Sequence, residues 1–432
     1  MYRNHFIISI RNKHYQRMAS LRKNQNFVRL FLGRLVTNVG DSLYLIAALW
    51  LVHELGGSPF LTGVAGFLTL LPGALQFLTG PFVDRWPLRR SLVVIQMIQA
   101  VCVLIIPLAA ATGQLTVVLV LVLIPILSML NQFVYPAQNA ALPRIVEDGN
   151  IVRANSAFSF AYNGVDAAFN AIGGILIAVV GAVSLYVLDS ITFVFAALLF
   201  ASVNYPSTEA ENEDTDESSI SQYWSDLSEG FAYVRGSVVF SIITTAAIAN
   251  FALQISTAVL PSFSDQQGGP EMYGAMLGAL AAGTLLGSLV APKLENREFG
   301  RVCIFVFFFG FVFWLGSIFS PWKYGTIGLF MLAWVPVGIF NVLVHATVQT
   351  IVPDELIGRA MSVTSGVSAA AGPVGALAGG AIASVWGSVV AMVVAAFGLL
   401  AVVGFFLVRP SLRQLPAITE IEGKGHAHAS ED

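Results

Sequence analysis

Long apolar runs, separated by short polar segments, recur along the whole chain. A helix needs about 20 mainly apolar residues to cross the hydrocarbon core of a bilayer. Runs of about this length lie at residues 27–54, 59–81, 90–111, 115–138, 151–180, 182–203, 237–263, 272–293, 300–319, 324–351, 358–384 and 387–408. The pattern predicts an all-α membrane protein with twelve transmembrane helices.

An acidic stretch, "EAENEDTDE" at 209–217, separates the sixth run from the seventh. A run of like charge with no apolar pattern is typical of a solvated linker. We therefore expect two six-helix bundles. The predicted segments are a basic cytoplasmic tail (1–26), the N-terminal bundle (27–205), the acidic cytoplasmic linker (206–236), the C-terminal bundle (237–409) and a second cytoplasmic tail (410–432). Met1 and Met18 are both possible starts, so the length of the first tail stays open.

Composition and charge fit this interpretation. The chain is 56% hydrophobic and 11% charged, whereas soluble proteins have about 25% charged residues. If the N-terminus is cytoplasmic, Lys323 is the one basic residue in a predicted external loop. Since cytoplasmic loops carry the excess of Lys and Arg, we expect a multi-pass plasma-membrane protein with both termini inside. We expect contact with the lipid bilayer, no nucleic-acid partner and a monomer.

The two halves resemble each other at nearly constant offsets. Gly63 matches Gly274 at an offset of 211, and Pro143 matches Pro353 at 210. Past a shorter loop, "IGG" at 172–174 lies over "AGG" at 378–380 at an offset of 206. Two parallel repeats are typical of transporters that bind their substrate between the halves, near the midplane of the membrane.

Several motifs carry a family resemblance. The loop "GPFVDRWPLRR" resembles the signature loop of the major facilitator superfamily, with Gly80, Asp84, Arg85, Arg89 and Arg90. It departs in that the basic pair comes one residue late and Pro87 replaces a usual glycine. "VGDSLYLIAALWLV", "LDSITF" and "SDLSEGFAYVR" resemble the drug-exporter branch, which includes macrolide efflux proteins and the enterobactin exporter. The resemblance implies the major facilitator fold and favours export over import.

The signature loop suggests a conformational latch. Asp84 is an anion that can cap a neighbouring helix N-terminus, where unpaired N–H groups favour negative charge. By resemblance, that neighbour is the start of the eleventh span, near Arg359. The alternative is that the arginines of the loop only set the topology.

Polar residues inside the spans form stripes, each on one helix face. Backbone and side-chain polar groups facing lipid would stay unsatisfied, so the stripes must face protein or a wet cavity. By resemblance, the first, fourth, seventh and tenth spans line that cavity. The candidates for substrate binding or proton coupling are Arg34, Asn38, Asp41, Asn131, Tyr135, Asp166, Asn250, Gln254, Asn341 and His345. The alternative is structural: interhelical hydrogen bonds are worth about 0.6 kcal/mol apiece, and His345 also fits a satisfied core histidine.

The intramembrane acids are asymmetric. Asp41, Asp166 and Asp189 fall in the first half, and Asp41 matches Ala252 in the second. Burial favours the neutral form of a carboxyl group and water favours the ionised form, so such an acid can exchange protons as access changes. Asp41 is expected to bind protons or substrate, with a structural pairing to Arg34 as the alternative. Asp189, near the outer end of its span, is expected to be peripheral and structural.

No enzyme signature, metal-ligand spacing or phosphate-binding glycine loop occurs in the sequence. We therefore expect no catalytic activity and no cofactor. The expected function is export of an amphipathic organic compound (a drug, macrolide or siderophore-like molecule) by alternating access, with protons as the coupling ion in antiport. A uniporter or importer of a small metabolite or lipid is the alternative within transport. A membrane receptor or scaffold is the alternative of another class.

Overall fold

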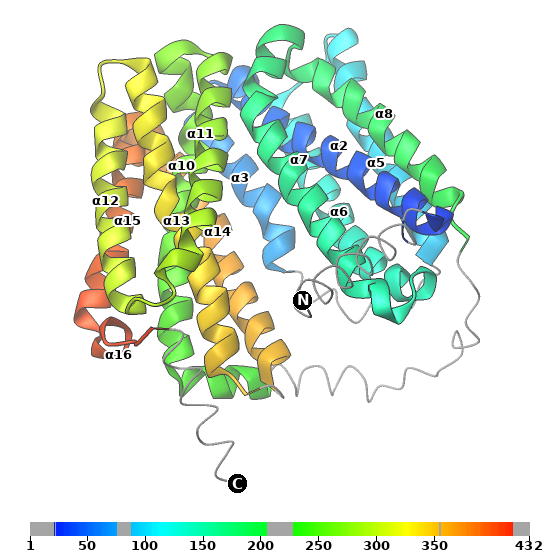
Figure 1. Ribbon diagram of the computed structural model, residues 1–432. Helices are drawn as coiled ribbons and strands as arrows, with labels where there is room; N and C mark the ends of the chain where they lie inside the picture. Colours follow the sequence, from blue (N-terminus) through cyan, green and yellow to red (C-terminus); the bar gives the residue numbers. More distant parts are fainter. Residues whose placement is uncertain (1–20, 22, 76–87, 205–227, 354–355, 418–432) are drawn as a thin grey trace, which may run out of the picture.

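The computed structural model describes residues 21, 23–75, 88–204, 228–353 and 356–417. The described ranges are almost entirely helical, and no strand occurs in them. The helices form two groups, which meet at the top of Figure 1 and diverge towards the bottom. The fold class predicted from the hydropathy pattern is confirmed.

The first bundle consists of α2 (Gln25–Gly56), α3 (Pro59–Ala74), α5 (Leu88–Ala111), α6 (Val117–Ile145), α7 (Ile151–Val180) and α8 (Ala182–Ala201). The second bundle consists of α10 (Val238–Gly268), α11 (Pro270–Val290), α12 (Phe299–Phe319), α13 (Lys323–Ile351), α14 (Ile357–Trp386) and α15 (Ser388–Val408). Short helices occur at η2 (Asp148–Asn150), η4 (Ala291–Leu294) and α16 (Pro410–Arg413). The proposed linker lies mostly outside the described residues, so the domain boundaries stay a prediction.

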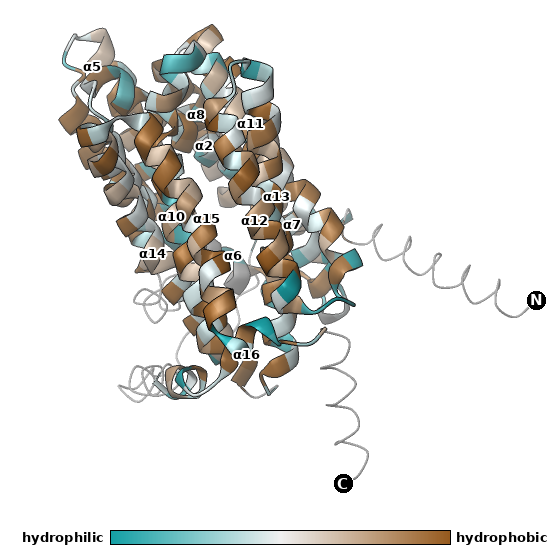
Figure 2. Cartoon of the chain, turned by 90° about the vertical axis from the view of Figure 1, so that its left-hand side faces the viewer, coloured by the Kyte–Doolittle hydropathy of each residue, from teal (hydrophilic) through white to brown (hydrophobic). Residues whose placement is uncertain are grey.

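The lengths of the helices suit a bilayer. Ten described helices are long and apolar enough to cross a membrane, and α7, bent by 52° between Asn170 and Ile172, would be an eleventh. The described part of α3 has 16 residues, and the predicted span 59–81 continues past it, outside the described residues. Together these helices correspond to the twelve predicted spans. Figure 2 shows hydrophobic residues along the helices and hydrophilic ones gathered near several of their ends.

Glycine sets the tightest connections between helices. Gly181, between α7 and α8, has φ 79°, and Gly387, between α14 and α15, has φ 89°. Glycine adopts these values without steric cost, whereas an L side chain does not. Residues 181 and 387 are separated by the same offset of 206 that relates "IGG" to "AGG". The same turn chemistry therefore serves both halves.

The two bundles share a core at one end only. We call the end that holds Gly57, Gly181 and Gly387 the closed end, and the opposite end the open end. At the closed end, one continuous hydrophobic cluster includes Trp50 of the first bundle and Tyr273 of the second. Towards the open end, a separate cluster around Phe27, Leu92 and Phe200 contains residues of the first bundle alone, among those described.

Candidate functional site

A cavity of about 220 Å³ lies inside the first bundle, between α2, α3, α5, α6 and α8. Its wall contains Asp41, Tyr44, Gln99 and Asn131. The side chain of Asn131 is close enough to the Asp41 carboxylate to form a hydrogen bond. Asp41 is half-buried. Two of the residues singled out from sequence, on the first and fourth predicted spans, therefore meet at one cavity.

Asp166 of α7 is bound to α2. Asn38 Nδ2 donates to Asp166 Oδ1 at 3.2 Å, and Ser42 Oγ donates to the same oxygen at 2.9 Å. The Asp166 side chain is exposed, so this contact lies on an open face of the first bundle rather than in its core. Asn38 therefore turns towards Asp166, while Asp41 turns towards Asn131.

Arg34 is buried, and the structure places it next to α6 and α7. Its Nε donates to Gln138 Oε1 at 2.7 Å and to the Tyr162 hydroxyl at 2.8 Å. The guanidinium lies 5.2 Å from the centre of the Tyr162 ring, a distance typical of a cation–π contact. Nη1 is buried with no partner among the described residues. In this conformation Arg34 is held by neutral groups, and no ion pair with Asp41 is present among the residues that the structure describes.

A buried polar chain connects α2 with the cavity through α5. Thr37 Oγ1 donates to Gln96 Oε1 at 3.0 Å, and Gln96 Nε2 donates to Gln99 Oε1 at 3.0 Å. Both glutamines are almost completely buried, and Gln99 lines the cavity. Sequence reasoning missed Gln96, Gln99, Gln138 and Tyr162. The only signal was a polar residue within an apolar run, which does not identify its partner on another helix.

The candidate residues of the second bundle are exposed or partly buried. Asn341 and His345 lie on one exposed stripe of α13, together with Gln349. Asn250 and Gln254 of α10 are partly buried. The structure does not bring these residues into the cavity around Asp41. The side chain of Tyr135 lies outside the described residues.

Part of the signature loop lies outside the described residues, namely Gly80, Asp84 and Arg85. Arg89 donates to the backbone oxygen of Ala201 at the end of α8, and Arg90 is exposed. Arg359, at the start of α14, forms an ion pair with Glu229 at 2.7 Å. The latch itself therefore stays a prediction.

The closed end is held by helices that touch backbone to backbone. A Cβ atom at Gly63 of α3 would lie 2.6 Å from Gly380 Cα of α14. A Cβ atom at Gly174 of α7 would lie 2.2 Å from Gly274 Cα of α11. Both distances are far below van der Waals contact, so only glycine permits this approach.

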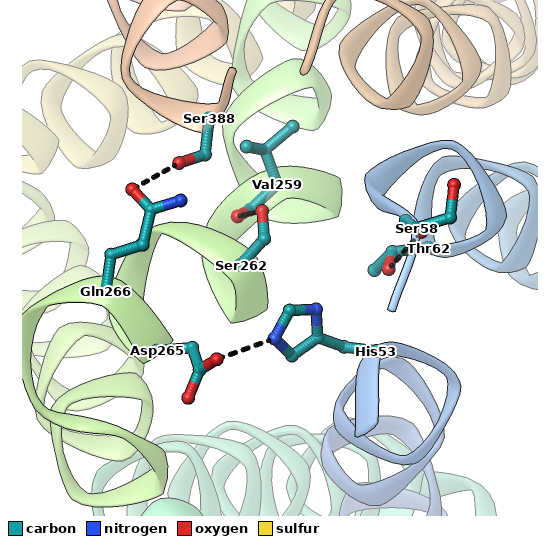
Figure 3. Close-up of polar contacts among 8 residues, drawn as sticks. All are labelled: His53, Ser58, Thr62, Val259, Ser262, Asp265, Gln266 and Ser388. Atoms are coloured by element: carbon teal, nitrogen blue, oxygen red, sulfur yellow. Dashed lines mark hydrogen bonds and ion pairs between the residues drawn. The ribbon is translucent and has the colours of Figure 1, made fainter. Parts of the chain in front are cut away.

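Side chains add contacts between α2 and the second bundle at the same end. His53 Nε2 lies 3.3 Å from Asp265 Oδ2 of α10, as Figure 3 shows. The rings of Trp50 and Tyr273 stack with their centres 5.4 Å apart. Within the second bundle, Ser388 at the start of α15 donates to Gln266 of α10 at 3.1 Å, beside the His53–Asp265 contact in Figure 3. The His53–Asp265 and Trp50–Tyr273 contacts close this end of the space between the bundles.

Asp189 differs from the sequence-based expectation. It is fully buried on α8 and not peripheral. The reason is Gly40 of α2: without a side chain there, the α2 backbone leaves room for the carboxyl group of Asp189.

Sequence comparisons find transporters. The family model described as "Transmembrane secretion effector" matches residues 16–430. Multidrug efflux pump Tap of Mycobacterium tuberculosis is 25% identical over 379 residues, covering 84% of this chain and 88% of the relative. The uncharacterized MFS-type transporter YvqJ of Bacillus subtilis is 25% identical over 371 residues, covering 84% of this chain and 87% of the relative.

Solved structures agree on the fold. The nucleoside transporter NupG superposes with a TM-score of 0.67 at 13% identity, covering 89% of this chain and 98% of that one. A bacterial homologue of the human lysosomal transporter Spinster, in an inward-facing and occupied conformation, gives a TM-score of 0.71 at 11% identity, with 90% and 96% covered. The chain belongs to the transmembrane secretion effector family of the major facilitator superfamily, and it is a multi-pass membrane transporter rather than an enzyme.

Proposed function

We propose that this transporter exports an amphipathic organic compound by alternating access, coupled to proton antiport at Asp41. The observation that carries the proposal is the Asp41–Asn131 pair, which lines a cavity inside the first bundle. A carboxylate at bilayer depth is costly and marks a functional site by default. The second bundle has no acid at the equivalent position, because Ala252 stands there.

The charge distribution supports an orientation. Of the described Lys and Arg residues, Lys323 lies at the closed end, and the others lie at or towards the open end. By the positive-inside rule, the open end faces the cytoplasm of a cell whose plasma membrane holds the protein. The conformation is then the inward-open state, in which a compound enters from the cytoplasm or the inner leaflet.

The coupling follows from the cost of a buried charge. When the cavity is sealed, the Asp41 carboxylate must be neutralised by a proton or by a bound compound that is cationic or donates hydrogen bonds. Binding of compound from the cytoplasm releases the proton, and release of compound outside lets a proton bind. The protein then returns empty and protonated. One acid thus exchanges protons against substrate, and a monomer is sufficient for this cycle.

The direction of transport is supported by the similarity to Tap, which is named a multidrug efflux pump. The resemblance of "VGDSLYLIAALWLV" and "LDSITF" to drug exporters points the same way. A uniporter or an importer makes a different prediction, because neither would raise the drug tolerance of a host cell.

The test has two parts. In a drug-sensitive host, the gene should raise the tolerated concentration of at least one compound in a panel of ethidium, erythromycin and tetracycline. In reconstituted vesicles, an imposed pH gradient should drive that compound across the membrane in the direction opposite to the movement of protons. Asp41→Asn should abolish both effects at wild-type expression, whereas Glu54→Gln, on the exposed outer turn of the same helix, should leave them intact. Transport by the wild type that continues unchanged without a pH gradient would overturn the antiport, and full activity of Asp41→Asn would overturn the role of Asp41.

A further inference from the structure

Asp189 is a buried acid that the cycle above does not use. Its carboxyl group lies against α2 at Gly40, where a Cβ atom would lie 2.2 Å from Oδ1. Gly40 directly precedes Asp41. Two motifs far apart in sequence, "VGDSLY" with Asp41 on α2 and "LDSITF" with Asp189 on α8, thus place their acids at the same turn of α2.

The surroundings of Asp189 suit a neutral acid. Thr192 Oγ1 lies 3.3 Å from Asp189 Oδ1, but its hydroxyl also lies 2.7 Å from the backbone oxygen of Asp189 and has one hydrogen to donate. Oδ2 is buried with no partner in the described part of the chain, and no described Lys, Arg or His forms an ion pair with it. An ionised carboxylate in such a place carries a large desolvation penalty, so the neutral form is favoured for as long as water does not reach the group.

A second buried polar group without a partner lies on the same helix. The Tyr186 hydroxyl, one turn back along α8, is also buried without a partner among the described residues. The Tyr186 ring packs edge-on against Tyr44, with the ring centres 6.0 Å apart. Tyr44 lines the same cavity as Asp41. Unsatisfied buried groups of this kind call for an explanation, and a proton that comes and goes supplies one.

Because Asp189 lies against Gly40, the residue directly before Asp41, the two carboxyl groups are near enough for the charge on one to act on the other. Two carboxyl groups in range of each other do not ionise independently, since the charge on one disfavours the charge on the other. Phe193, one turn further along α8, lies in the cavity wall. A shift of α2 against α8 would therefore expose Asp189 to the same water that reaches Asp41.

We propose that Asp189 is a second proton-binding residue, so that two protons enter for each compound exported. The inference rests on the proton antiport proposed above. Each of the two carboxylates gains one proton from water on the outer side and returns it to water on the inner side, with no other bond made or broken. A second proton lets the same pH gradient drive a steeper gradient of compound.

The experiment measures the number of protons that move per molecule of compound. Vesicles containing the full-length protein are loaded with the exported compound from the panel, and the pH gradient that just stops its net movement is found. The wild type should give a ratio of two and Asp189→Asn a ratio of one. Ser190→Ala, a buried neighbour whose hydroxyl donates to Ala100 at 3.0 Å on α5, should keep a ratio of two.

The outcomes separate the two proposals. No coupled proton movement in the wild type overturns the antiport and this inference with it. A wild-type ratio of one, or an unchanged ratio of two in Asp189→Asn, overturns the role of Asp189 and leaves the antiport standing. If Asp189→Asn does not fold, Asp166→Asn decides: a ratio that stays at two excludes Asp166 and supports Asp189, whereas a fall to one assigns the second proton to Asp166 and overturns the role of Asp189.

Discussion

Gly63 of α3 and Gly380 of α14 meet so closely that a Cβ atom on either would lie 2.6 Å from the Cα of the other. Gly174 and Gly274 repeat this contact between α7 and α11. The internal repeat equates Gly63 with Gly274 and Gly174 with Gly380. The two contacts are therefore related by the exchange of the two halves, and the closed end is pseudo-symmetric.

A methyl group at this contact should weaken the closed end. In Gly63→Ala, the added carbon faces the backbone of α14, which cannot rotate away as a side chain does, so the two bundles must separate. We expect a shift towards the outward-open state and a loss of transport. The readout is the labelling of Ser262→Cys, a buried position of α10 near the closed end, by a membrane-impermeant thiol reagent. The background carries Cys102→Ser and Cys303→Ser. Labelling should rise several-fold.

The matched control for that substitution is Gly404→Ala. Gly404 lies on α15, and no atom of a neighbouring helix lies within 4 Å of the place that a Cβ atom would take. An alanine there also stabilises a helix by up to about 1 kcal/mol relative to glycine. Equal labelling in Gly63→Ala and Gly404→Ala would show that the glycine contact does not hold the closed end.

A disulfide should lock the closed end reversibly. A Cβ atom at Gly66 of α3 would lie 3.5 Å from the Cβ of Ala258 of α10, within the range of about 3.5–4.5 Å that disulfides require. In the same cysteine-free background, Gly66→Cys with Ala258→Cys should cross-link on oxidation and stop transport. Dithiothreitol should restore it. Each single cysteine variant should transport under both conditions, and transport by the fully cross-linked protein would contradict alternating access at this end.

Asp166 offers a way to separate hydrogen bonding from charge. Asn38 and Ser42 both donate to Oδ1 of this residue, and an asparagine oxygen can accept both bonds. If Asp166 serves to position α2 against α7, Asp166→Asn should transport within about twofold of the wild type, since interhelical hydrogen bonds are each worth about 0.6 kcal/mol. Asp166→Ala, which loses both bonds, should be clearly slower. Complete loss of proton-coupled export in Asp166→Asn would instead assign the role to the charge.

Much of the architecture follows from the sequence. The span lengths, the parallel repeat and the stripe of Asn341 and His345 come from hydropathy and periodicity, and the structure agrees with the fold that they predict. The sequence also predicts that Asp41 and Asn131 face protein or a wet cavity, because a polar group at bilayer depth requires a polar neighbour or water.

The sequence does not predict which side chains of other helices a buried polar residue contacts. Arg34 could pair with any acid in reach, yet it binds Gln138 of α6 and Tyr162 of α7. Each of the two directly precedes an asparagine, and the sequence alone does not show which polar residue Arg34 meets. The burial of Asp189 was missed because α8 is apolar on every side, so periodicity does not identify its inner face. Asp189 is buried because Gly40 of α2 leaves room for its carboxyl group. A single sequence does not reveal that these two helices are in contact.

The open end provides the last test. Arg359 pairs with Glu229 at 2.7 Å, but both side chains are partly exposed to solvent. Exposed ion pairs are worth about 0–1 kcal/mol, so Glu229→Gln should leave the turnover rate within about twofold of the wild type. The proposed latch at Asp84 makes the opposite prediction for Asp84→Asn, because a carboxylate at a helix N-terminus would hold this end shut in the outward-open state. We expect Asp84→Asn to fold, to bind compound and to turn over at least tenfold more slowly, measured as counterflow in vesicles. Equal rates in the two variants would mean that the basic residues of the loop serve topology alone.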